Sequence, residues 1–177
     1  MVVTACGVAG QPRYNLRLAM EFYTWLQDTA FAHWVASSPS LLAYPTILTL
    51  HTVGMSIVVG TCVVLDLRLL GIGGDVPLKA LRRAPRLVWT GFLINAMTGL
   101  ALFTTDAEHK VVQTVFYVKL VLIAVALAAY GRIRSLMFAD EASAASAVSI
   151  EVKTLAVVSL ILWTGATVAG RLMAYLL

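Results

Sequence analysis

Residues 41–70, which read LLAYPTILTLHTVGMSIVVGTCVVLDLRLL, decide the fold of this chain. From Leu41 to Leu65 this stretch contains no Asp, Glu, Lys or Arg. At about 1.5 Å of rise per residue, a helix of this length crosses a hydrocarbon core that is roughly 30 Å thick. The stretch therefore predicts a membrane-spanning helix. His51 lies inside it, and an ionisable side chain within a span is by default a hypothesis about function.

The whole chain has the composition of an integral membrane protein. Of its 177 residues, 60% are hydrophobic and 12% are charged, whereas soluble domains carry about 25% charged residues. Its two cysteines, Cys6 and Cys62, form neither a disulfide framework nor a zinc spacing. The net charge of +4 comes mainly from loops beside apolar stretches, which argues against nucleic acid as a partner. The partner that this composition predicts is the lipid bilayer.

Four apolar stretches predict an all-α fold, a four-helix transmembrane bundle. The spans are expected at about residues 42–65, 87–104, 111–130 and 154–177, within a single domain over residues 20–177. Before them, residues 20–38 predict one amphipathic interfacial helix, because aromatic side chains suit the headgroup boundary and charges interrupt the apolar run. Residues 1–19 are expected to form a poorly ordered extension, with Met20 as an alternative translation start.

The distribution of basic residues predicts how the bundle is oriented. The loops after the first and third spans hold most of the lysines and arginines, and the turn between the second and third spans is acidic. By the positive-inside rule, both basic loops face the cytoplasm, so both termini and the amphipathic helix face the periplasm or exterior. The expected location is the inner membrane of a bacterium, which the chain crosses several times.

Each span carries one costly polar side chain. His51, Asn95, Lys119 and Arg171 are expected within about 10 Å of one another in depth, at or outward of the midplane. A charged side chain there costs from about 2.5 kcal/mol upward unless it is paired, hydrated or close to the headgroups. One pocket between the helices, opening outward, would accommodate all of them. In the alternative, Arg171 reaches the headgroups and the other side chains hydrogen-bond between helices.

Two cofactors are candidates for this pocket. Imidazole binds haem iron and basic side chains neutralise haem propionates, so His51 with Lys119 and Arg171 suits one b-type haem. No other predicted span contains a histidine, so the iron is either five-coordinate or takes a second ligand from His33, His109 or Met97. For copper, His51 and Met55 stand at i and i+4 and combine imidazole with thioether, which suits Cu(I). An anionic or quinone-like ligand, or none at all, remains an alternative.

Five segments of the chain match the motifs of a known family. These segments are Trp25-Leu26-Gln27, Thr52 to Gly60, Asp66-Leu67-Arg68-Leu69-Leu70-Gly71, Tyr117-Val118-Lys119-Leu120 and Trp163 to Arg171. With them, the chain from Met20 to Leu177 resembles the DUF6644 family of bacterial four-helix membrane proteins. This resemblance implies the fold and no activity. More distantly, His51 with Gly60, and Lys119 leading to Arg132, is similar to the copper-resistance D-type proteins and related b-type cytochromes. That similarity implies copper handling or haem-linked electron transfer, although the repeated histidines of di-haem bundles are missing here.

Taken together, the residues predict a membrane protein that binds a cofactor or ligand. The leading interpretation is one b-type haem on His51, used for electron transfer with other membrane or periplasmic redox subunits. The alternatives are a non-catalytic membrane subunit of a larger complex and a protein that transports copper or another small solute. A second copy of the chain, in a homo-oligomer, is a further candidate partner. The sequence shows no nucleophile–base pair, carboxylate pair, phosphate loop or zinc spacing, so a hydrolytic or phosphoryl-transfer enzyme is not expected.

Overall fold

The structure, a computed structural model, describes residues 11–72, 83–138, 148–173 and 175. In this part of the chain every regular element is a helix. Four of the helices are long and apolar enough to cross a membrane, and they are α3 (Tyr44–Leu69), α4 (Ala84–Thr104), α6 (Thr114–Phe138) and α7 (Ile150–Leu172). The predicted all-α fold with a four-helix membrane bundle is therefore confirmed.

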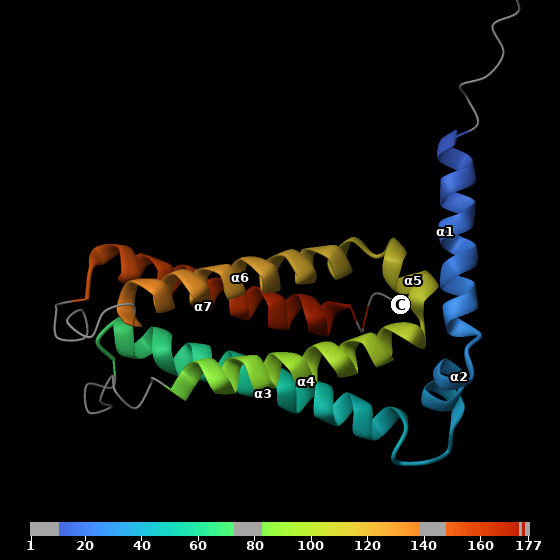
Figure 1. Cartoon of the computed structure of the whole chain (residues 1–177), viewed down its shortest axis with the longest axis horizontal. Coiled ribbons are helices and arrows are strands. Elements are labelled where there is room, and N and C mark those ends of the chain that lie inside the picture. Colours follow the sequence, from blue (N-terminus) through green and yellow to red (C-terminus); the bar gives the residue numbers. More distant parts are fainter. Residues whose placement is uncertain (1–10, 73–82, 139–147, 174, 176–177) are drawn as a thin grey trace, which may run out of the picture.

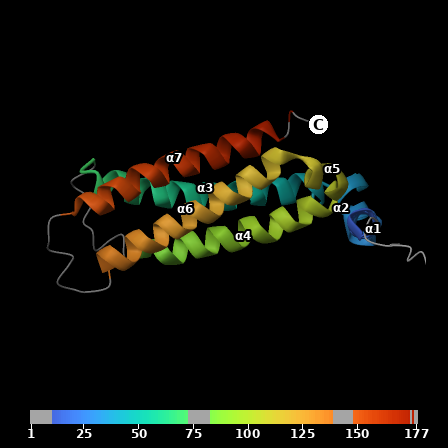
Figure 2. The ribbon, with the colours of Figure 1, turned by 90° about the horizontal axis from the view of Figure 1, so that it is seen from above.

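The four long helices lie in two layers (Figures 1 and 2). α3 packs along α4, α6 packs along α7, and α3 also contacts α7 between the layers. The apolar core lies towards the end of the bundle where α3 finishes, which we call the Leu69 end. Its largest fully buried side chains include Val58, Leu65, Leu69, Ile133 and Trp163. The opposite end, where α3 begins, is called the Tyr44 end.

The outward faces of the long helices are apolar. Leu93 of α4, Val121 of α6 and Ile161 of α7 are 63%, 60% and 65% exposed, respectively. Large apolar side chains on every outer face are unfavourable in water, whereas hydrocarbon surrounds them at no such cost. A lipid bilayer is the environment that these faces fit.

The N-terminal region differs from the predicted single helix over residues 20–38. It forms α1 (Gln11–Gln27) and α2 (Ala30–Ser37), and the chain breaks between them because Thr29 is extended and its hydroxyl accepts the Ala32 N–H at 3.3 Å. The start of α1 also lies inside the predicted poorly ordered extension. An i,i+4 ion pair joins Arg17 to Glu21 at 3.7 Å on this helix. Residues 1–10 lie outside the described residues.

The limits of the spans differ from the predicted ones by a few residues. α3 continues beyond Leu65 because Asp66 is turned into the bundle and Leu69 packs in the core. α6 begins only at Thr114, since the extended Gln113 separates it from the short helix α5 (Ala107–Val112). α7 starts earlier than predicted because Ser149 caps it by accepting the Val152 N–H at 3.4 Å.

Three short elements cover the Tyr44 end. α1 runs across this end of the bundle instead of along the spans, where it contacts α5 (Figure 1). α2 connects α1 to the start of α3 and contacts α4. The Tyr44 end therefore carries α1, α2 and α5 beside the ends of the four spans, whereas the Leu69 end holds the core.

Candidate functional site

His51 of α3 is held by α4 through one ring nitrogen. Its Nδ1 lies 3.0 Å from the backbone oxygen of Asn95 and 3.1 Å from Oγ1 of Thr98. The carbonyl oxygen only accepts, and the Thr98 hydroxyl already donates to the Ile94 carbonyl at 2.6 Å. Nδ1 therefore carries the hydrogen, which in a neutral imidazole leaves Nε2 as the unprotonated nitrogen. The described residues form no hydrogen bond with Nε2.

Glycines bring α3 and α4 close enough for these bonds. A Cβ on Gly54 would lie 2.8 Å from the backbone nitrogen of Asn95 and 2.9 Å from the Gly91 oxygen. A Cβ on Gly99 would lie 3.1 Å from Cε1 of His51. Small residues at a helix interface allow such backbone contact within a membrane. The position of the imidazole is thus set by the packing of two helices.

Lys119 of α6 lies in the same half of the bundle. Its side chain passes over Gly170 of α7, where a Cβ would come within 3.4 Å of Cε and 3.5 Å of Nζ. Its charge acts on His51, so the two side chains are close enough to interact across the two layers. Among the described residues, no acceptor or acidic group pairs with this ammonium. An unpaired cation in a span is costly and favours an anionic or carbonyl-bearing ligand beside it.

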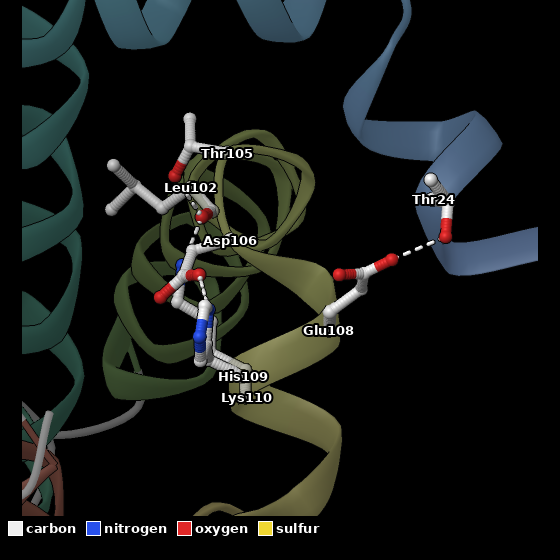
Figure 3. Close-up of polar contacts among 7 residues, drawn as sticks. All are labelled: Thr24, Leu102, Thr105, Asp106, Glu108, His109 and Lys110. Carbon is white, nitrogen blue, oxygen red and sulfur yellow. Dashed lines mark hydrogen bonds and ion pairs between the residues drawn. The ribbon is translucent and has the colours of Figure 1, made fainter. Parts of the chain in front are cut away.

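A second lysine lies at the Tyr44 end, on α5. Nζ of Lys110 donates to the backbone carbonyl of Leu102 near the end of α4 (Figure 3). Burial lowers the pKa of Lys110, and the charge of Lys119 acts in the same direction, whereas Asp106 opposes both. The charges of two lysines from different helices, Lys110 and Lys119, therefore act on each other at this end of the bundle.

α5 is anchored by α1. Thr24 donates to the Glu108 carboxylate (Figure 3). The amide of Gln27 faces the backbone N–H groups of Ala107 and Glu108, and because both are donors we assign its oxygen to that side, where it accepts from each at 2.7 Å. These N–H groups belong to the first turn of α5 and have no acceptor within the helix, so Gln27 caps it. The N-terminal helix thereby holds the element that carries Lys110.

The remaining predicted site residues lie at exposed positions or outside these contacts. Arg171 is exposed, although it adjoins Gly170, and His33 is exposed on α2. Met97 is 62% exposed on α4. The side chain of His109 is 75% exposed and pairs with Asp106 at 2.6 Å (Figure 3). Met55 is half-buried, one turn after His51 on α3.

The structure therefore brings together three of the predicted residues, His51, Asn95 and Lys119. Within the described ranges, no group of three or more His, Cys, Asp or Glu side chains is placed to hold a metal ion. For a haem or a metal, His51 is the predicted ligand whose ring nitrogen is oriented by a hydrogen bond to a backbone carbonyl.

The sequence interpretation missed a second polar group, at the Leu69 end. Cys62 and Asp66 of α3 and Ser159 and Trp163 of α7 are each only 1% exposed. The predicted first span ends at Leu65, which places Asp66 at its boundary. The i,i+4 spacing of both pairs is the signal that could have revealed them, because it places each pair on one face of its helix.

Comparisons with known proteins give no family for this geometry, because no protein-family model, no curated protein and no solved structure matches the chain. The resemblance to the DUF6644 family stays a prediction from the motifs.

Proposed function

We propose that this chain is a membrane protein that binds a ligand or cofactor between its helices, at His51 and Lys119. The hydrogen-bonding of these two side chains supports the proposal. Nδ1 of His51 is bonded to α4, Nε2 has no partner among the described residues, and the nearby ammonium is likewise unpaired there. A histidine held through one nitrogen by a backbone carbonyl is the arrangement that metal-ligating histidines use.

One b-type haem is the cofactor that suits this pair best. His51 would hold the iron through Nε2, and Lys119 would neutralise a propionate. Haem supplies one-electron chemistry, so the role would be electron transfer with another membrane or periplasmic redox protein. His33, His109 and Met97 lie at exposed positions, which favours His51 as the single axial ligand from this chain.

The visible absorption spectrum tests this assignment. The full-length protein is produced with added haem precursor, purified in mild detergent, and measured oxidised and after reduction with dithionite. We expect a Soret band that shifts on reduction and is lost in His51→Ala. His109→Ala is the matched control, because this histidine is exposed, and it should keep the band. A wild-type protein without a Soret band would overturn the haem assignment, and metal analysis of wild type against His51→Ala then tests copper.

The hydrogen bonds that Asn95 makes favour a second function. Its amide donates to the His51 carbonyl at 2.8 Å and its own carbonyl accepts from the imidazole. Polar side chains used in this way hold membrane helices together. In this alternative the chain is a non-catalytic membrane subunit of a larger complex. Recovery of a stoichiometric partner chain in mild detergent, with no bound cofactor or metal, would favour it over the haem proposal and over transport of copper or another small solute.

The orientation that we propose places the Leu69 end in the cytoplasm of a bacterium, with the Tyr44 end outside. Arg83 and Arg86 at the start of α4, and Arg132 and Arg134 near the end of α6, lie at the Leu69 end. Basic residues beside spans favour the cytoplasmic side. In a Cys6→Ser background, Ser37→Cys should react with a membrane-impermeant thiol reagent on spheroplasts, whereas Ser135→Cys should react only after lysis. The reverse pattern would invert the topology.

A further inference from the structure

The buried polar group at the Leu69 end consists of two facing pairs, Cys62 and Asp66 on α3, and Ser159 and Trp163 on α7. The Ser159 hydroxyl lies beside the Asp66 carboxylate, and the indole of Trp163 lies beside the Cys62 thiol. All four side chains are 1% exposed, so they lie in the interior of the bundle and away from its outer surface. This group is separate from His51 and Lys119, which lie in the other half of the bundle.

The polar atoms of this group do not satisfy one another. Oδ2 of Asp66, Oγ of Ser159 and Nε1 of Trp163 have no hydrogen-bond partner among the described residues. Each such atom costs free energy when it is buried without a partner. One acceptor, one hydroxyl and one N–H donor, buried on two contacting helices, are the kinds of partner that a single buried water molecule bonds to.

Within the described part of the chain, no charged side chain acts on the Asp66 carboxylate. From α3 and α7 it meets the Cys62 thiol and the Ser159 hydroxyl. From α6, the Tyr130 phenol lies near Cys62, and the charge of Arg134 on the same helix acts on Tyr130. Arg68 is two residues further along α3, and residues at i and i+2 of a helix point to different sides.

An ionised carboxylate in this position would be strongly destabilised. Either a small cation or a proton can neutralise this carboxylate. The indole N–H of Trp163 is only a donor and disfavours a cation beside it. A proton suits all the groups, because a neutral carboxyl group both donates and accepts hydrogen bonds.

We propose that Asp66 is a buried proton-binding site, with a water molecule between α3 and α7 as its exchange partner. Binding forms one O–H bond on the carboxyl group and removes its negative charge. Release breaks that bond and passes the proton to the water oxygen. Ser159 and Trp163 are positioning residues that hold the water and the carboxyl group.

Infrared spectroscopy of the full-length protein in liposomes tests this proposal at neutral pH. We expect the C=O stretch of a protonated carboxyl group, which moves to lower frequency in D₂O because the proton exchanges. The band should be missing in Asp66→Asn. It should remain in Asp28→Asn, the matched control, because Asp28 is exposed at the end of α1. Ser159→Ala keeps the acid but removes a neighbouring hydroxyl, so the band should persist at a higher frequency.

Three results would overturn the proposal. The first is a difference between the wild-type and Asp66→Asn spectra that contains only carboxylate bands and no band of a protonated carboxyl group. The second is an acid band that appears only when choline replaces Na⁺ and K⁺ in the buffer, which would identify a cation site. The third is a band that neither D₂O nor Ser159→Ala moves. If Asp66→Asn does not fold, the frequency of the C=O band in Ser159→Ala still tests the proposal.

Discussion

Asn95 and His51 bond each other in both directions across α3 and α4. The side-chain amide of Asn95 donates to the backbone carbonyl of His51 at 2.8 Å, and the backbone carbonyl of Asn95 accepts from the imidazole at 3.0 Å. The position of the imidazole is therefore coupled to the packing of the two helices. Any change that separates α3 from α4 should loosen the histidine and destabilise the bundle together.

Replacing Asn95 by alanine should lower the free energy of unfolding by about 1 kcal/mol, the scale of an interhelical hydrogen bond within a membrane. The measurement is unfolding in mixed micelles with increasing dodecyl sulfate. Thr164→Ala is the matched control, because its exposed hydroxyl donates to the Leu160 carbonyl of its own helix at 2.8 Å and to no other group among the described residues. Equal losses in both variants would show that the Asn95 bonds contribute nothing beyond a local one.

Replacing Gly54 by alanine should force α3 and α4 apart, because the added methyl would lie under 3.0 Å from backbone atoms of Asn95 and Gly91. Overpacking of this kind costs about 1–3 kcal/mol, and the same detergent unfolding measures it. Gly60→Ala is the control on the same helix, since no described atom beyond the neighbouring residues and the local helix backbone lies within 4 Å of its Cβ position. This change should be neutral or stabilise by up to about 1 kcal/mol through helix propensity. A stable Gly54→Ala protein would contradict the close packing.

Replacing Lys119 by methionine should stabilise the folded protein, because it removes a cation that has no acidic partner among the described residues. The same change should weaken binding of an anionic ligand or a haem propionate, so stability and binding should move in opposite directions. Unfolding in micelles and the Soret absorbance per chain measure the two effects. Lys119→Arg, which keeps the charge, should retain more binding than methionine. A destabilised Lys119→Met protein would indicate that the ammonium is paired.

The pH dependence of stability should carry a contribution from Lys110. Burial lowers the pKa of this lysine, so between that lowered pKa and its ordinary value of 10.5 the unfolded chain binds more protons than the folded one. Stability therefore rises with pH over this alkaline range. The measurement is the thermal unfolding temperature as a function of pH. In Lys110→Gln this part of the increase should be missing, whereas Lys153→Gln, which changes an exposed lysine of α7, should keep it. An unchanged slope in Lys110→Gln would contradict the prediction.

The sequence could predict the number of spans and the residues that interrupt them. The uncharged run from Leu41 to Leu65 requires a span, because its length matches the hydrocarbon core and charged side chains avoid that core. The depths of His51 and Lys119 followed from the rise per residue. The break at Thr29 is encoded locally, since its hydroxyl caps α2, but the aromatic pattern around it masked this signal.

Only the tertiary structure decided which side of each helix faces the interior. Apolar residues surround each span on all sides, so hydropathy does not define the rotation of a helix about its axis. Packing against neighbours does: it turned Gly170 towards Lys119 while Arg171 stayed exposed, and it buried Asp66 against Ser159. The residues of both candidate sites were readable in the chain, but which of them meet is a property of how the helices contact one another.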